Sequence, residues 1–162
     1  MRPSEHASNW AAGLAVVGAA GVGLVGLTRW WAERERQATG YVNGKAVAIT
    51  VVGIDGKPVE LGTARAYRRM QAAAAAAGVW IKVVSGFRTM AEQEYLYGCY
   101  IRCSCNNCNL AAKPGHSNHQ SGHALDLNAR DPVVGAWLRT HAHTYGFRNT
   151  IASEPWHWEY RP

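Results

Sequence analysis

The sequence predicts an α+β fold, in which strands and helices follow one another without a regular β–α–β alternation. Short β-branched runs such as residues 45–54 (KAVAITVVGI) are typical of strands. Residues 63–78 (TARAYRRMQAAAAAAG) and those after Thr89 have the composition and end signals of helices. With 48% hydrophobic and 17% charged residues, the 162-residue chain is expected to form one folded domain with a short extension.

The first 31 residues predict an apolar helix of the membrane type. Residues 11–27 (AAGLAVVGAAGVGLVGL) carry no charged side chain. Trp10 and Trp30 flank them at a helical spacing of about 30 Å, the thickness of a bilayer core. The segment is only weakly apolar, because ten of its seventeen residues are Gly or Ala. A membrane anchor, an uncleaved signal and a helix packed inside a larger assembly all fit residues 11–28.

A polar linker over residues 32–43 (AERERQATGYVN) is expected to lead into a domain over residues 44–162. Thr63 is a suitable N-cap for the alanine-rich helix and Gly78 a suitable end. In chain order, the first half is predicted to contain a strand at 45–54, a turn at 55–58 (DGKP), a helix at 63–78 and a strand at 79–85.

The second half carries clearer end signals. Residues 89–92 (TMAE) form a capping box, which predicts a helix through Tyr95. Asp131 followed by Pro132 begins another helix, which Gly146 is expected to end. Two further strands are predicted, at 123–128 (HALDLN) and at 154–160 (EPWHWEY).

The net charge of +6 indicates an anionic partner only in a general way. Lysines and arginines are scattered, with no basic run longer than Arg68-Arg69, and no nucleic-acid-binding motif is present. We therefore expect no nucleic-acid partner. An anionic cell envelope fits the charge.

Three histidines and one aspartate lie within residues 116–126 (HSNHQSGHALD). A catalytic zinc keeps three protein ligands and one open position. His119 and Asp126 can converge if the first lies in a loop and the second on the strand that follows. His157, in a short aromatic strand, is a candidate third ligand. Glu154, three residues earlier, is a candidate general base.

Three motifs resemble those of the D-alanyl-D-alanine carboxypeptidase, or M15 metallopeptidase, family. Residues 117–126 (SNHQSGHALD) resemble its S-x-H-x-x-G-x-A-x-D signature, and residues 154–157 (EPWH) its E-x-W-H motif. Residues 85–88 (SGFR) resemble its S-G-[YF]-R motif, which a glutamine follows, here Gln93. The motifs occur in the family's order, and the resemblance covers residues 41–160.

This resemblance implies a small antiparallel sheet flanked by helices, with one catalytic Zn²⁺. It implies that His119, Asp126 and His157 bind the metal and that Glu154 is the catalytic base. It also implies contacts with the substrate for four side chains: Arg88, Gln93, Ser117 and Trp156. Of these, Arg88 would also face the developing oxyanion.

The other two histidines of the cluster are not expected to be ligands. Strand alternation places His123 on the opposite face from Ala124 and Asp126. His116 matches no ligand position of the family motif.

The family cleaves peptidoglycan stem peptides, so the resemblance implies zinc-dependent hydrolysis of such peptides. Both a D,D-carboxypeptidase and an L-Ala-D-Glu endopeptidase of the phage endolysin type fit. The alternative is a non-catalytic wall-binding or structural component of a phage particle or injection machine.

The implied substrate places the catalytic domain in the cell envelope, outside the cytoplasm and associated with the membrane. The positive-inside rule opposes this orientation, because Arg29, Arg34 and Arg36 follow the apolar segment. A releasable signal-anchor, as in some phage lysis enzymes, or a place within a phage virion would resolve the conflict.

Four cysteines form the pattern C-x3-C-x-C-x2-C: Cys99, Cys103, Cys105 and Cys108. Two disulfides are favoured, with three pairings open. A structural zinc and free thiols are the alternatives, although the spacing is tight for a four-cysteine zinc site. The segment separates the SGFR motif from the His119 motif and can shape the mouth of a cleft.

Overall fold

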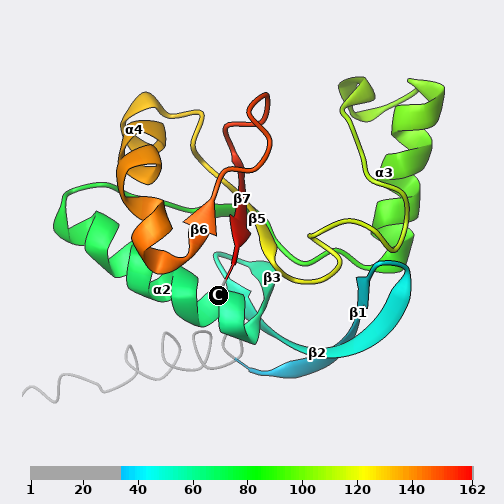
Figure 1. The fold of residues 1–162 in the computed structure, drawn as a ribbon, viewed down its shortest axis with the longest axis horizontal. Coiled ribbons are helices and arrows are strands. Elements are labelled where there is room, and N and C mark those ends of the chain that lie inside the picture. Colours follow the sequence, from blue (N-terminus) through cyan, green and yellow to red (C-terminus); the bar gives the residue numbers. More distant parts are fainter. Residues whose placement is uncertain (1–33, 162) are drawn as a thin grey trace, which may run out of the picture.

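The computed structural model describes residues 34–161, which contain two antiparallel sheets, three α-helices and short 3-10 helices (Figure 1). The predicted α+β class is confirmed. The apolar helix predicted within residues 1–31 lies outside the described residues. Within residues 34–161, no helix combines the length and the apolarity needed to cross a membrane.

The first sheet has the strand order β1-β2-β3 and consists of Arg36–Val42 (β1), Lys45–Ile54 (β2) and Lys57–Glu60 (β3). Two-residue turns join the strands. Asn43, Gly44, Asp55 and Gly56 all have positive φ, as turns matched to the twist of a hairpin require.

Two predictions in this region were wrong. The linker expected at residues 32–43 contains strand β1, every residue of which pairs with β2. Most of β1 is exposed, so its polar composition matches that of a linker. The turn expected at 55–58 is limited to Asp55-Gly56, since Lys57 and Pro58 already belong to the edge strand β3.

Helix α2 (Leu61–Ala76) begins three residues earlier than predicted, because Glu60 rather than Thr63 is its N-cap. The Glu60 carboxylate accepts hydrogen bonds from the backbone N–H groups of Gly62 and Thr63, at 2.9 and 2.8 Å. A negative charge there is favoured by the positive end of the helix dipole. The Thr63 hydroxyl instead donates to the Gly122 carbonyl oxygen at 2.9 Å and ties α2 to the loop before β5.

The second sheet has the order β4-β5-β7-β6 and consists of Val83–Ser85 (β4), Ala124–Leu127 (β5), His157–Tyr160 (β7) and Phe147–Arg148 (β6). Strands at the β5 and β7 positions were predicted, and β6 was not. Of the strand predicted at 79–85, only the last three residues form β4. The residues before them bond the Asn128 side chain instead of a neighbouring strand: Asn128 accepts from the Lys82 backbone N–H and donates to the Trp80 carbonyl oxygen.

The two remaining helices begin where the sequence predicts. Helix α3 (Met90–Arg102) has the capping box between Thr89 and Glu92. Helix α4 (Pro132–His141) has Asp131 at its N-cap, and a 3-10 turn then continues to Gly146. In Figure 1, α3 stands at the opposite end of the molecule from α4.

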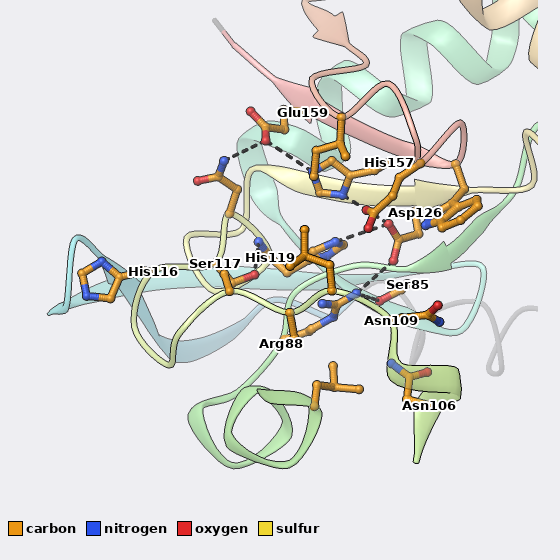
Figure 2. Close-up of a pocket in the computed structure, with 18 residues that line it drawn as sticks. Ser85, Arg88, Asn106, Asn109, His116, Ser117, His119, Asp126, His157 and Glu159 are labelled. Carbon is orange, nitrogen blue, oxygen red and sulfur yellow. Dashed lines mark hydrogen bonds and ion pairs between the residues drawn. The ribbon is translucent and has the colours of Figure 1, made fainter. Parts of the chain in front are cut away.

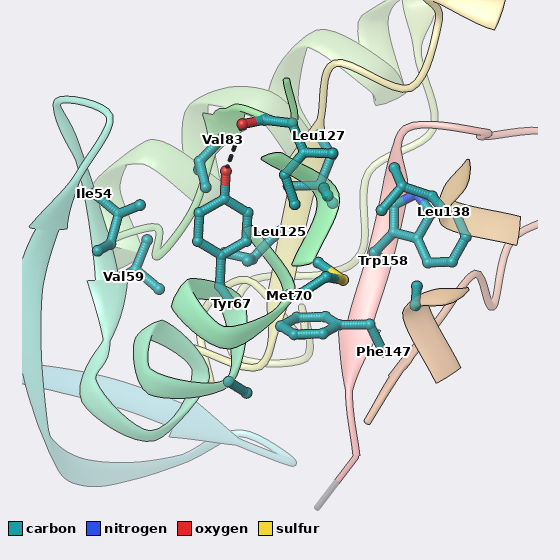
Figure 3. Close-up of a cluster of buried hydrophobic side chains, with 14 of the residues drawn as sticks. Ile54, Val59, Tyr67, Met70, Val83, Leu125, Leu127, Leu138, Phe147 and Trp158 are labelled. Atoms are coloured by element: carbon teal, nitrogen blue, oxygen red, sulfur yellow. Dashed lines mark hydrogen bonds between the residues drawn. The ribbon is translucent and has the colours of Figure 1, made fainter. Parts of the chain in front are cut away.

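The core lies between α2, α4 and the second sheet. Figure 3 shows Tyr67 and Met70 of α2 beside Leu125 and Leu127 of β5, and all four side chains are fully buried. Burying a side chain of this kind stabilises a fold by about 1.5–3 kcal/mol. Because Leu125 and Leu127 face this core, alternation turns Asp126, between them, to the other face of the sheet.

Candidate metal centre and cleft

Strands β5 and β7 present three polar side chains on the face of the sheet that lies away from the core. Asp126 on β5 is the direct ladder partner of His157 on β7. Two residues further along β7, Glu159 returns to the same face, whereas Trp158 between them is buried in the core. The strand pairing therefore fixes a carboxylate and an imidazole side by side.

His119 joins this pair from the loop before β5. Its Nε2 lies 3.4 Å from Asp126 Oδ1, and His157 Nδ1 lies 3.4 Å from the same oxygen. One donor atom from each of the three residues lies within 4.8 Å of the others. Figure 2 shows the three side chains gathered at one place. Two imidazole nitrogens and one carboxylate oxygen, with a cavity in front, fit a zinc site that keeps one position open.

The backbone of the SGFR segment orients His119. The Gly86 carbonyl oxygen lies 2.8 Å from His119 Nδ1, which leaves Nε2 facing Asp126. The Arg88 backbone N–H donates to the His119 carbonyl oxygen at 3.1 Å. Burial lowers the pKa of the His119 imidazole, although Asp126 opposes the shift, so the ring is held in the neutral form that binds metals.

His157 has the reverse orientation. Its Nδ1 faces Asp126, and its Nε2 lies 3.3 Å from Glu159 Oε1. Burial alone would lower the pKa of His157, but the hydrogen bonds and charges of Asp126 and Glu159 raise it above the ordinary value. In the absence of metal, the His157 ring therefore holds a proton more readily than the His119 ring.

Asp126 is ionised, and its two oxygens have separate partners. Oδ1 faces the two histidines, while Oδ2 accepts a hydrogen bond from Arg88 Nη2 at 2.9 Å. Burial would raise the pKa of Asp126, but His119, His157 and Arg88 together hold it well below its usual range. Arg88, expected to contact substrate, also lines the cavity and is 3.5 Å from Ser85 Oγ.

A cavity of about 510 Å³ opens in front of the three candidate ligands. Glu154, Trp156, Ser117 and Asn118 are among the residues that line it. Ser117 is buried, and its hydroxyl accepts from the His119 backbone N–H at 3.3 Å, so it supports the ligand loop. Arg130 lies over the Trp156 ring at 4.2 Å and holds that side chain at the rim.

Gln93, expected to contact substrate, does not line this cavity. It is fully buried, and its amide donates to the Ala112 carbonyl oxygen at 2.9 Å, so it supports the wall from behind. His116 lies at the exposed edge of the cavity, and His123 contacts Ser121. Neither histidine belongs to the three-residue group that could hold a metal.

The cysteines are joined in two disulfides, Cys99–Cys105 and Cys103–Cys108, a pairing that the spacing alone leaves open. They connect the end of α3 to a short segment that lines the cavity with Asn106, Asn109, Leu110, Ala111 and Ala112. Both Asn106 and Asn107 have positive φ, a conformation that asparagine adopts more readily than most residues. They lie between Cys105 and Cys108, so the two disulfides hold the segment that forms this part of the cavity lining.

Glu159 belongs to none of the three sequence motifs, yet its carboxylate is buried against His157. The available signal was the two-residue period of the strand, which places positions 157 and 159 on one face. Burial would raise the pKa of Glu159, but hydrogen bonds led by that of Asn118 lower it to about 2.

Comparisons with known proteins identify the family of this chain. Residues 57–162 match the family model VanY, D-alanyl-D-alanine carboxypeptidase. A comparison with curated proteins finds no match. Among solved structures, VanYB in complex with D-alanine-D-alanine is 27% identical, with a TM-score of 0.52 over 65% of this chain and 73% of that one.

Two further solved structures have the same fold. The LdcB LD-carboxypeptidase is 26% identical, with a TM-score of 0.54 over 64% of this chain and 59% of that one. A mutant of the D,D-pentapeptidase VanY in complex with Zn(II) is 23% identical, with a TM-score of 0.55 over 82% of this chain and 80% of that one. The family model spans all three motifs, so the chain belongs to the D-alanyl-D-alanine carboxypeptidase family of VanY, among the M15-type zinc peptidases.

Proposed function

We propose that this chain is a zinc peptidase that hydrolyses peptide bonds in peptidoglycan stem peptides. The observation that carries the proposal is the convergence of His119, Asp126 and His157 at one end of a cavity that Glu154 also lines. Membership of the VanY family supports the same reaction and substrate class.

The three donor atoms fit zinc better than a harder cation. Imidazole nitrogens suit zinc, whereas magnesium and calcium prefer oxygen ligands throughout. Each histidine has its second nitrogen occupied, by Gly86 or by Glu159, which is the usual arrangement around a bound zinc. Zinc held there would supply a Lewis acid that lowers the pKa of water toward neutrality and polarises a carbonyl group.

Glu154 is the group we assign to proton transfer. Its backbone is fixed, because its N–H donates to Ile151 and its carbonyl oxygen accepts from the backbone N–H of His157 at 3.0 Å. Its half-buried carboxylate lines the cavity and makes no hydrogen bond to another residue in the described part of the chain. It is thus available to take a proton from the attacking water and to return it to the leaving amine.

Arg88 serves two purposes in this proposal. Its ion pair keeps Asp126 ionised and turned toward the histidines. Its position in the cavity wall also suits a carboxylate at the C-terminus of a stem peptide, which a guanidinium binds well. The relative solved with D-alanine-D-alanine supports this use, so we favour removal of a C-terminal residue over cleavage within the peptide.

The proposed substrate lies outside the cytoplasmic membrane. Two disulfides in the described chain suit an oxidising compartment of that kind. We therefore propose that the domain acts in the cell envelope. Residues 11–28 are proposed to hold it at a membrane or in a larger assembly.

The deciding experiment is digestion of purified peptidoglycan by the full chain, with products identified by mass spectrometry. Wild type is compared with Glu154→Gln, and each is assayed after chelation and after zinc is restored. Loss of one terminal residue that needs both zinc and Glu154 supports a carboxypeptidase, and release of longer fragments supports an endopeptidase. Binding to the wall without any zinc-dependent product would support the non-catalytic alternative and refute the proposal.

A further inference from the structure

The buried carboxylate of Glu159 has no part in the reaction proposed above, yet it contacts the metal centre directly. Glu159 is only 7% exposed and lies on the same face of β7 as His157. A buried carboxylate is costly unless its oxygens are fully hydrogen-bonded. Its partners therefore indicate why it is there.

One oxygen of Glu159 connects the two segments that carry the histidines. Oε1 lies 3.3 Å from His157 Nε2 and accepts a hydrogen bond from Asn118 Nδ2 at 2.8 Å. Asn118 immediately precedes His119, and its carbonyl oxygen accepts from the backbone N–H groups of His123 and Ala124. The same oxygen thus holds β7 and the His119 loop together (Figure 2).

The second oxygen faces outward. Oε2 accepts from Arg161 Nη2 at 3.0 Å, and the Arg161 side chain is 61% exposed. With both oxygens engaged, Glu159 is poorly suited to accept a proton from substrate or water, in contrast to Glu154.

The two histidines differ in what orients them. His119 is held by the Gly86 backbone carbonyl, which no side-chain substitution removes. His157 is held at Nε2 by a side chain. A ring released at Nε2 can turn Nδ1 away from Asp126, so the orientation of His157 depends on Glu159.

We propose that Glu159 is a positioning residue of the metal centre, which sets zinc affinity by fixing Nε2 of His157 and, through Asn118, the His119 loop. The proposal rests on zinc binding by the three ligands assigned under the proposed function. Removing a hydrogen-bond partner of a metal-binding histidine typically weakens metal binding ten- to a hundredfold. We expect that loss for Glu159→Ala.

The test measures zinc affinity of the full chain by competition with a chromophoric chelator, and no hydrolysis is needed. Glu159→Gln keeps an acceptor oxygen for His157 and Asn118 and is expected to bind zinc within about threefold of wild type. Glu159→Asp keeps the charge, but its side chain is one methylene shorter, so the carboxylate no longer reaches His157 and Asn118. It is expected to weaken zinc binding as Glu159→Ala does. Arg161→Ala leaves Oε1 in place and should bind zinc like wild type.

A second readout separates positioning from general destabilisation. Cobalt-substituted Glu159→Asp should show altered visible absorption bands, while its metal-free thermal midpoint stays near that of Glu159→Gln. Wild-type affinity and spectra in both Glu159→Ala and Glu159→Asp would overturn the inference. Zinc binding by wild type without peptide hydrolysis would refute the proposed function and leave the role of Glu159 standing.

Discussion

Arg88 is expected to stabilise the metal-free protein as well as to serve the reaction. Its Nη2 lies 2.9 Å from Asp126 Oδ2, and the two side chains are 21% and 13% exposed. At an effective dielectric constant of about 20, opposite charges at this distance attract by about 6 kcal/mol. Desolvation offsets part of this, and removing one partner of a buried pair usually costs about 3–5 kcal/mol. We expect the lower end, about 3 kcal/mol, for Arg88→Ala, because the two histidines remain beside Asp126.

The assay is urea unfolding of the metal-free protein at pH 7, followed by circular dichroism. Arg161→Ala is the matched control, since Arg161 binds Glu159 at a similar 3.0 Å but has a side chain that is 61% exposed. It should cost less than about 1 kcal/mol, as surface pairs do. The double variant Arg88→Ala, Asp126→Asn should recover much of the loss, because it leaves no unpaired buried charge.

Saturating zinc should reduce the cost of Arg88→Ala, because a bound cation replaces the lost positive charge beside Asp126. Equal stability of Arg88→Ala and Arg161→Ala in the metal-free state would refute the reasoning. The reasoning would also be refuted if the double variant Arg88→Ala, Asp126→Asn were no more stable than Arg88→Ala alone.

Three further outcomes are expected. Glu154→Gln should keep wild-type zinc affinity in chelator competition while its kcat falls at least about a hundredfold, as loss of a general base implies. Reduction of the two disulfides should raise KM for stem peptides in steady-state assays. It should leave the amount of bound zinc, measured by elemental analysis, unchanged, because no cysteine lies among the candidate ligands. The raised pKa of His157 should make metal-free stability fall as pH rises from about 6.5 through that pKa, while zinc affinity, titrated over the same range, rises.

Where buried and exposed residues alternate, the sequence was sufficient to predict local structure. Leu125 and Leu127 on either side of Asp126 predict both the strand and the face on which the aspartate lies, and the structure has that arrangement. The caps at Thr89 and Asp131 likewise predict where α3 and α4 begin. These signals are local, so one stretch of sequence contains them completely.

The features that sequence reasoning missed depend on partners far along the chain. Strand β1 is mostly exposed and becomes recognisable only through its pairing with β2. Thr63 is a residue type that often caps helices, but its hydroxyl donates a hydrogen bond to the carbonyl oxygen of Gly122, 59 residues away. Gln93 matches a motif position, yet its side chain is directed to Ala112 rather than to the cavity. The strand period places Glu159 on the face of His157, but its partner Asn118 lies 41 residues earlier in the chain.

The metal centre and the cleft wall are stabilised in different ways. Asp126 and His157 lie on strands whose other face is the hydrophobic core, through Leu125 and Trp158. Ligand geometry is therefore coupled to the stability of the whole domain. The cysteine segment is held instead by two disulfides at the end of α3, outside the main core cluster. We therefore expect substitutions in the cysteine segment to change which peptide the cleft accepts while Asp126 and His157 stay in place, because the disulfides hold the segment and the β5–β7 pairing holds the two side chains.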